Sequence, residues 1–211
     1  GSGTVIYSGT SAQQIFSGTY NNLTTQTSNQ VRTIQGNVTV NNDLTITLGT
    51  FSFGNVLRTV SVSGNLSGAG TIDMSGGGVA HVLNLGGVNN TIGTLTTAAG
   101  ASIINYNRAG DQTVFSNANY RNLTISGSGN KTMQGDVTVG GTATFNTGGC
   151  ALEINGNTLY LNNSTTGANG TITGSLTSNI VITGNATPAM VLPAITGGLN
   201  NFTINKTGAT N

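Results

Sequence analysis

The fold is decided by residues 32–40, Arg32-Thr33-Ile34-Gln35-Gly36-Asn37-Val38-Thr39-Val40, which return as Lys131-Thr132-Met133-Gln134-Gly135-Asp136-Val137-Thr138-Val139. The spacing is 99 residues, and the flanking segments recur at 99 or 100 residues. These flanking pairs are Gln14-Ile15-Phe16-Ser17 with Thr113-Val114-Phe115-Ser116, and Tyr20-Asn21-Asn22-Leu23-Thr24 with Tyr120-Arg121-Asn122-Leu123-Thr124. A fixed long period indicates a repetitive architecture.

The repeat predicts how the chain is organised. We expect a first repeat unit over residues 1–101, a second over residues 102–191 and the start of a third over residues 192–211, where Leu199-Asn200-Asn201-Phe202-Thr203-Ile204 returns to the pattern. Since the pattern starts and stops inside a copy, we expect further repeats of the same longer chain as its neighbours.

Short runs of alternating apolar and polar residues occur throughout both units. Examples are Val38-Thr39-Val40, Leu44-Thr45-Ile46-Thr47-Leu48, Val137-Thr138-Val139, Leu152-Glu153-Ile154 and Leu159-Tyr160-Leu161. A period of two predicts half-buried β-strands. The Gly-Asn, Gly-Gly and Asn-Asn pairs between the runs favour turns. No segment has the period of an amphipathic helix, so the sequence predicts an all-β protein.

The distance between turns selects the architecture. Strand and turn units group into segments of about 20 residues, such as 31–49, 50–68 and 130–149. This length suits the coils of a parallel β-solenoid with short strands on each coil. We therefore predict a parallel β-solenoid (β-helix) of about ten coils. The alternative is a tandem array of antiparallel β-sandwich repeats.

The same pattern predicts which side chains fill the core. Apolar residues that recur in both repeats should point inward between stacked coils. This set of predicted core residues is Phe16, Tyr20, Leu23, Val38, Val40, Phe115, Tyr120, Leu123, Val137 and Val139. Outward positions hold Thr, Ser and Asn, which stack on their own kind without the repulsion that charges would suffer.

The combination of Tyr20-Asn21-Asn22-Leu23-Thr24, a Gly/Ser turn and Arg32–Val40 resembles the long repeats of giant surface adhesins and filament proteins of Bacteroidetes. Many proteins of that kind are exported by the type IX secretion route. The resemblance covers most of residues 3–54 and 102–157, and the segment from Leu192. It implies a secreted protein at the bacterial cell surface, with a homo-oligomeric or fibre assembly and contact with a cell-surface glycan, prey or substratum.

The composition provides few residues for catalysis, metal binding or nucleic-acid binding. Only 5% of the residues are charged, against roughly 25% in ordinary globular proteins, and the net charge is +1. The six basic residues are scattered, so we expect no nucleic-acid partner. No apolar stretch reaches the roughly 20 residues of a spanning helix, so we expect no membrane span. We predict no catalytic residues, no cofactor and no metal site.

The few reactive side chains have structural interpretations. His81 shares the parity of Leu83 and Leu85, which predicts a partly buried, hydrogen-bonded imidazole. Cys150 aligns with Phe51 and should behave as a small buried hydrophobe. The acids are Asp43, Asp73, Asp111, Asp136 and Glu153, and we expect them to cap turns or lie on the surface.

These observations predict a non-enzymatic structural shaft segment of a large extracellular adhesin or cell-surface filament. A ligand-binding solenoid for ice or glycan is the alternative, and a carbohydrate-active enzyme is the weakest candidate. The ice hypothesis depends on Thr-x-Thr pairs stacked on one flat face, because regular Thr arrays resemble the surfaces of ice-binding solenoids. The pairs are Thr45 and Thr47, Thr94 and Thr96, Thr142 and Thr144, and Thr171 and Thr173.

Overall fold

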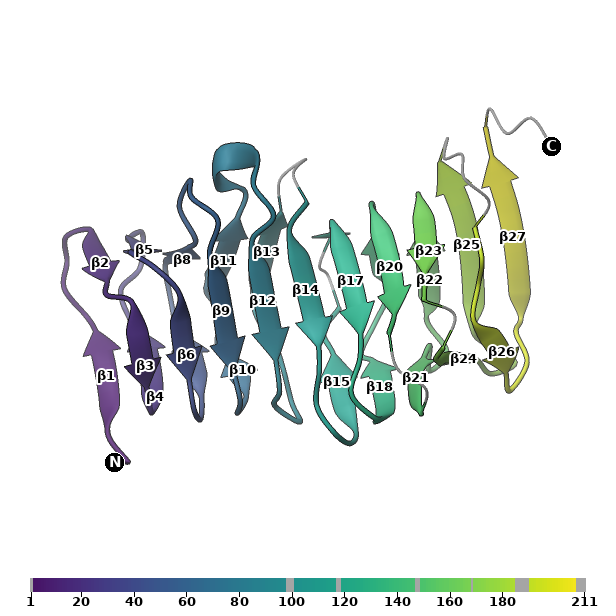
Figure 1. Ribbon diagram of the computed structural model, residues 1–211, viewed down its shortest axis with the longest axis horizontal. Coiled ribbons are helices and arrows are strands. Elements are labelled where there is room, and N and C mark those ends of the chain that lie inside the picture. The colour runs from purple at the N-terminus through teal and green to yellow at the C-terminus, as the bar shows by residue number, and fades with distance from the viewer. Residues whose placement is uncertain are drawn as a thin grey trace. The chain divides into compact units, whose positions relative to one another are not determined.

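The protein is an all-β solenoid in this computed structural model, as Figure 1 shows. The structure describes residues 2–97, 101–116, 119–146, 149–167, 169–184 and 190–207. Strands make up 52% and helix 2% of the structure, which has about 9 turns of about 21 residues each. The predicted fold class is confirmed, with about one coil fewer than the predicted ten.

The chain forms two compact units, Gly1–Ile104 and Asn105–Asn211. In each unit the strands follow one another around three parallel sheets. Each strand inside a sheet pairs with the strand one coil earlier and the strand one coil later, and the end strands pair on one side. The division by sequence repeat, at residues 101/102 and 191/192, stays a prediction.

Three sheets form the N-terminal unit. Sheet A has the order β1 (Thr4–Tyr7), β4 (Asn22–Thr25), β7 (Leu44–Ile46), β10 (Leu66–Ser67). Sheet B has the order β13 (Thr94–Thr97), β11 (Thr71–Met74), β8 (Thr50–Ser52), β5 (Val31–Ile34), β2 (Gln13–Ile15). Sheet C has the order β12 (Val82–Leu85), β9 (Thr59–Val62), β6 (Val38–Val40), β3 (Gly18–Tyr20).

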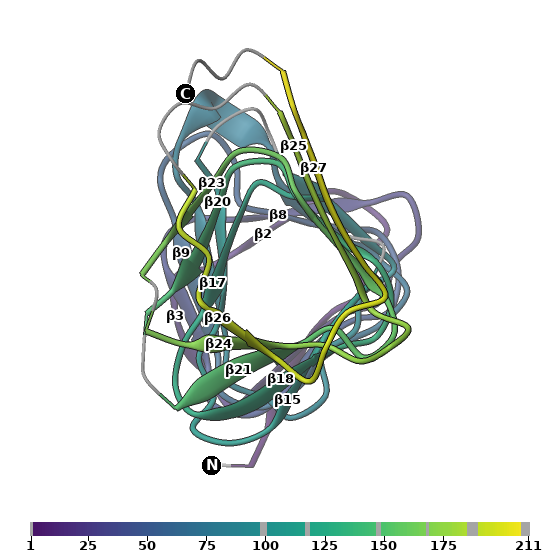
Figure 2. The same ribbon diagram turned by 90° about the vertical axis from the view of Figure 1, so that its right-hand side faces the viewer.

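The C-terminal unit repeats the scheme, and Figure 2 shows its strands on three sides of each coil. Sheet D denotes four strands of an eight-stranded sheet, in the order β23 (Ser164–Thr166), β20 (Thr142–Phe145), β17 (Asn122–Ile125), β14 (Ile103–Tyr106). Sheet E has the order β15 (Gln112–Val114), β18 (Gly129–Met133), β21 (Cys150–Glu153), β24 (Thr171–Thr173), β26 (Ala194–Thr196). Sheet F has the order β16 (Asn119–Tyr120), β19 (Val137–Val139), β22 (Thr158–Leu161), β25 (Asn179–Gly184), β27 (Asn201–Lys206).

Strand pairing excludes the antiparallel sandwich. Leu23 of β4 pairs with Leu44 of β7, which pairs with Leu66 of β10, and both ladders are parallel. An antiparallel meander would instead pair strands that follow one another in the chain. Here consecutive strands lie in different sheets, because the turn between them bends the chain around a corner.

The core consists of columns of inward side chains along the stack. Leu23, Leu44 and Leu66 form one such column, and all three are fully buried. Eight of the ten predicted core residues are buried: Leu23, Val38, Val40, Phe115, Tyr120, Leu123, Val137 and Val139. Tyr20 is half-buried.

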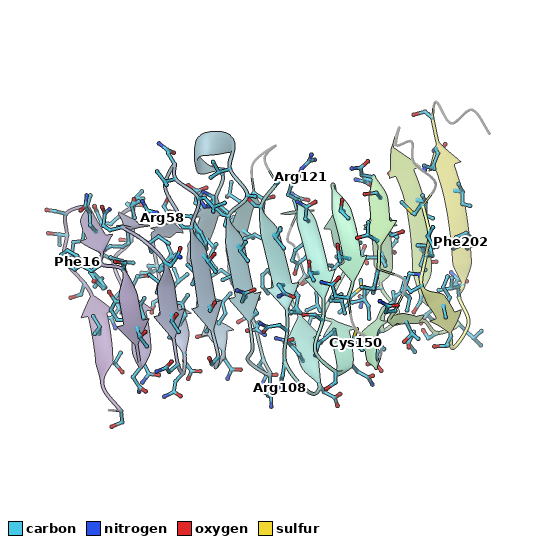
Figure 3. All side chains as sticks on the ribbon, in the orientation of Figure 1. Phe16, Arg58, Arg108, Arg121, Cys150 and Phe202 are labelled. Carbon is cyan, nitrogen blue, oxygen red and sulfur yellow. The ribbon has the colours of Figure 1, made fainter. Side chains whose placement is uncertain are left out.

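Phe16 departs from the predicted core, since 69% of its side chain is exposed. Ile15 holds the last inward position of β2 and is fully buried. Phe16 follows in the turn to β3, and Figure 3 shows it at the rim of the first coil. Its repeat partner Phe115 is buried against the rings of Tyr106 and Tyr120. The repeat pattern predicts both phenylalanines to be core residues, but only Phe115 is one.

The described chain contains one short helix, where the sequence predicted none. It is a 3-10 turn, η1 (Gly76–Gly78), between β11 and β12. Gly77 has φ of 63°, and a Cβ there would lie 2.1 Å from the carbonyl oxygen of Asn55. Only glycine lets this wide turn lie directly on the turn of the preceding coil.

Candidate functional site

Asn and Asp side chains at the corners join each coil to the next. Asn37 Oδ1 accepts a hydrogen bond from the backbone N–H of Thr59 at 2.8 Å, and its repeat partner Asp136 does the same for Thr158 at 2.8 Å. Asn22 and Asn122 also match, accepting from Asp43 N–H at 3.2 Å and from Thr142 N–H at 2.7 Å. The residues that recur in the sequence therefore satisfy backbone donors that the turns leave unpaired.

Each repeat contains two tyrosines whose hydroxyls face each other. In the C-terminal unit the hydroxyls of Tyr106 and Tyr120 lie 2.7 Å apart, and Tyr120 donates to the carbonyl oxygen of Phe115 at 2.9 Å. The N–H of Phe115 donates to Tyr106 at 3.3 Å. Burial raises the pKa of both phenols well above the ordinary value. In the N-terminal unit, Tyr7 and Tyr20 are 3.4 Å apart, and burial likewise raises the pKa of Tyr20.

Each repeat also buries one basic side chain. Arg32 is 2% exposed and donates to the carbonyl oxygens of Ser11 and Gly9 at 3.1 and 2.5 Å. Its repeat partner Lys131 is fully buried and donates to three carbonyl oxygens. Burial lowers the pKa of Lys131, while the Cys150 thiol and Asp111 carboxylate oppose that shift and Arg108 adds to it. The sequence analysis did not single out these residues, although their alignment across the repeat is a usable signal.

His81 is fully buried and hydrogen-bonded, more deeply than predicted. The backbone N–H of Arg58 donates to Nδ1 at 3.2 Å, so Nε2 carries the proton and donates to the carbonyl oxygen of Gly54 at 3.0 Å. The imidazole also packs against the ring of Phe53. These contacts join the turn before β12 to the turn between β8 and β9, which is a structural role.

The acidic residues accept hydrogen bonds at turns, as the sequence predicts. Asp111 accepts from the N–H of Asn130 at 2.9 Å, Asp43 from the N–H of Asn65 at 2.8 Å, and Asp73 from the N–H of Ser75 at 2.9 Å. Glu153 instead accepts from the hydroxyl of Thr132 at 2.7 Å. Among the residues that the structure describes, no three potential metal ligands of the His, Cys, Asp or Glu type gather at one place.

Cys150 lies on the inward side of β21 and is 2% exposed, where the predicted small hydrophobe belongs. Its thiol points toward the carbonyl oxygen of Ile125, 3.8 Å away. A shallow polar hollow of about 300 Å³ lies beside the same strand, lined by Glu153, Asn155, Gly156, Thr173, Gly174, Ser175 and Thr177. Its Ser175 hydroxyl bonds to Thr177 and Ser178 at 3.0 Å.

The predicted Thr-x-Thr pairs do not share a sheet within either unit. Thr45 lies on sheet A and Thr47 follows that strand, while Thr94 and Thr96 lie on sheet B. Thr142 and Thr144 lie on sheet D, and Thr171 and Thr173 on sheet E. The four pairs occupy four different sheets, because sequence spacing alone does not show which turn changes the face.

A different set of hydroxyls does form neighbouring columns, on the outer face of sheet D. Thr142 pairs with Ser164, and their hydroxyls are 2.9 Å apart. In the next column Thr124, Thr144 and Thr166 follow one another, with Thr144 and Thr166 bonded at 3.0 Å. The sequence analysis missed Thr124, Ser164 and Thr166, which only the strand register brings beside Thr142 and Thr144.

The geometry defines a class of protein, a parallel β-solenoid whose recurring polar residues connect successive coils. Comparison with protein-family models, curated protein sequences and solved structures found no match to the chain. In the part of the chain that the structure describes, no helix has the length and apolar character needed to cross a membrane.

Proposed function

We propose that this chain is a non-enzymatic structural shaft segment of a large extracellular adhesin or cell-surface filament. One observation carries the proposal: the polar residues common to both repeats are used in contacts between coils. Asn37 and Asp136 bind the next coil's backbone, and Arg32 and Lys131 bind backbone carbonyls within their units. Repetition of this kind preserves stacking, which is what a spacer requires.

Composition supports the same proposal. With 5% charged residues, the outer faces can stack Thr, Ser and Asn at the coil spacing without repulsion. Hydroxyl pairs such as Thr45 with Ser67, 3.2 Å apart, extend the coil-to-coil contacts onto the outer face. The finer proposal is a secreted repeat segment of the Bacteroidetes adhesin type, with neighbouring repeats as partners. It is supported by the resemblance of Tyr20–Thr24 and Arg32–Val40.

The test is the length of the protein in solution. A shaft requires the two units to be collinear, so about 9 coils at roughly 4.8 Å each should span roughly 45 Å. Small-angle X-ray scattering should then give a rod whose cross-section is constant along its length. A bent or compact particle, or two units that scatter independently, would contradict the shaft and favour a discrete binding module.

The hydroxyl columns of sheet D favour a second candidate, a surface that binds ice or glycan. Thr142 with Ser164, and Thr124 with Thr144 and Thr166, place hydroxyl and methyl groups at the coil spacing. Thr144→Tyr would interrupt this lattice without touching the core. Loss of thermal hysteresis, or of binding on a glycan array, in that variant alone would support the candidate. Absence of both activities in the unmodified protein would dismiss it.

A further inference from the structure

Lys131 lies in a cage of backbone oxygens. Its Nζ donates to the carbonyl oxygens of Arg108 at 2.8 Å, Gly110 at 2.7 Å and Ser128 at 2.8 Å. An ammonium group has three N–H donors and no acceptor, so three carbonyl oxygens satisfy it completely. The side chain is fully buried, and these bonds replace the water that it lost.

Two turns of successive coils build the cage. Arg108 and Gly110 lie between β14 and β15, and Ser128 lies between β17 and β18. The turns also bond to each other, since Gly110 N–H donates to Ser128 O at 3.1 Å and Ser128 N–H donates to Arg108 O at 3.2 Å. Gly127 permits this approach, because its φ is 76° and a Cβ there would lie 2.2 Å from the same Arg108 oxygen.

The N-terminal unit contains a related arrangement, with two of the three oxygens at the same repeat positions. Gly9 and Ser11 precede Arg108 and Gly110 by 99 residues, and their carbonyl oxygens accept from Arg32 at 2.5 and 3.1 Å. A guanidinium fork meets these two oxygens, and its Nε has no partner. The cage is thus a feature of the repeat that accepts either an ammonium or a guanidinium group.

We propose that the cage formed by the carbonyl oxygens of Arg108, Gly110 and Ser128 is a binding site for a primary ammonium group. Its three oxygens match the three N–H donors of such a group. The chain fills this site with its own Lys131. The bound ammonium holds the β14–β15 turn in register on the β17–β18 turn.

In a stack of similar coils, some contact must fix how each strand aligns with its neighbour. A slip along a strand by one residue would turn inward side chains outward, and short strands provide few contacts to prevent it. A buried polar group that has partners in only one alignment opposes the slip. The cage oxygens are in place for Lys131 only when the two turns are correctly stacked. This inference does not depend on the proposed shaft function.

Chemical rescue tests the site. Lys131→Ala removes the equivalent of n-propylammonium and should lower the Tm of the full chain by several degrees. Added n-propylammonium chloride should restore part of that loss in a saturable manner. Tetramethylammonium chloride has no N–H donors and should restore none, and the unmodified protein should respond to neither salt. Equal responses to both salts, or no response to either, would overturn the proposal.

A second pair of variants covers the case in which Lys131→Ala does not fold. Lys131→Met keeps the aliphatic stem without donors, whereas Lys131→Arg keeps the charge and donors that Arg32 shows to be acceptable. The Tm should fall further in Lys131→Met than in Lys131→Arg, and Lys206→Met on β27 is the control for loss of a lysine outside a cage. A Tm of Lys131→Met equal to that of the unmodified protein would refute the site.

Discussion

The hydroxyl of Tyr120 closes a ring of hydrogen bonds inside the C-terminal unit. Phe115 N–H donates to Tyr106, Tyr106 to Tyr120, and Tyr120 to Phe115 O, over 3.3, 2.7 and 2.9 Å. All three residues are buried. A buried ring of this kind has every donor and acceptor satisfied, so removal of one member leaves the others without partners.

Tyr120→Phe should therefore lower the free energy of unfolding by about 1–3 kcal/mol near neutral pH. The loss of stability as the pH rises above about 10 should also be smaller in this variant than in the unmodified protein. In the folded protein burial raises the phenol pKa values, whereas an unfolded tyrosine ionises near pH 10. The stability that the buried phenols contribute is thus fully present below about pH 10 and is lost as the pH rises further. Urea denaturation at several pH values measures both effects.

Tyr160→Phe is the matched control, because Tyr160 lies on the outer side of β22 and is only half-buried. Its free energy of unfolding should change by less than about 0.5 kcal/mol. Equal effects of the two substitutions would show that the ring of hydrogen bonds contributes nothing specific.

The corner residue Asn37 can be tested with the residue that stands at the equivalent position of the second repeat, Asp136. Asn37→Ala removes the acceptor for Thr59 N–H and should cost about 1 kcal/mol of unfolding free energy. Asn37→Asp should cost less than half as much, because Asp136 fills the same role for Thr158. Thermal denaturation of the two variants side by side measures the difference. A larger loss for Asp than for Ala would contradict this account of the corner.

At the scale of elements, each strand has one face in the core and one face in solvent. In β19, Val139 is fully buried and Thr138 is half-buried on the outer side. Val139→Thr should cost about 1–3 kcal/mol, because a hydroxyl enters an apolar column without a partner. Thr138→Val, one residue away, should change the free energy of unfolding by less than about 0.5 kcal/mol. Chemical denaturation of both variants measures this, and similar losses would contradict the assigned faces.

The sequence predicts the elements better than their faces. The strand Val38–Val40 is predicted residue for residue, since the turns on both sides contain Gly or Asn. Leu44–Leu48 is predicted too long, because β7 ends at Ile46 where the chain bends toward the next sheet. The sheet to which each strand belongs depends on how far each intervening turn rotates the chain. For this reason the Thr-x-Thr pairs could not be placed on a common face.

The polar sites also fall into two groups: those that a local sequence pattern predicts and those that only the stacking of coils creates. Corner Asx residues and the buried His81 and Cys150 follow from local patterns, and the structure places them where those patterns predict. The oxygen cage of Lys131 depends on two turns brought together by stacking, so no local pattern shows it. The exposed Phe16 is the opposite case, in which local similarity to Phe115 is misleading.

For the molecule as a whole, the scarcity of charge has a measurable consequence. With only 6 basic and 5 acidic side chains, few charge pairs remain to be screened by salt. Between about 0.01 M and 0.15 M ionic strength the Debye length falls from about 30 to 8 Å. The free energy of unfolding should nevertheless change by less than about 0.5 kcal/mol over that range. Denaturant titrations at both salt concentrations measure this, and a strong salt dependence would show that charges organise the fold.

The corner hydrogen bonds also have a polarity. Among the described residues, the side-chain oxygen belongs to the earlier coil and the N–H group to the next one at Asn22, Asn37, Asp43, Asn65, Asp111, Asn122 and Asp136. Asn90, which accepts from Leu66, is oriented the other way. A finished coil therefore presents ready acceptors to the segment that follows it in the chain. If the chain folds from its N-terminus, each of these acceptors is therefore in place before the N–H group that it binds arrives with the following coil.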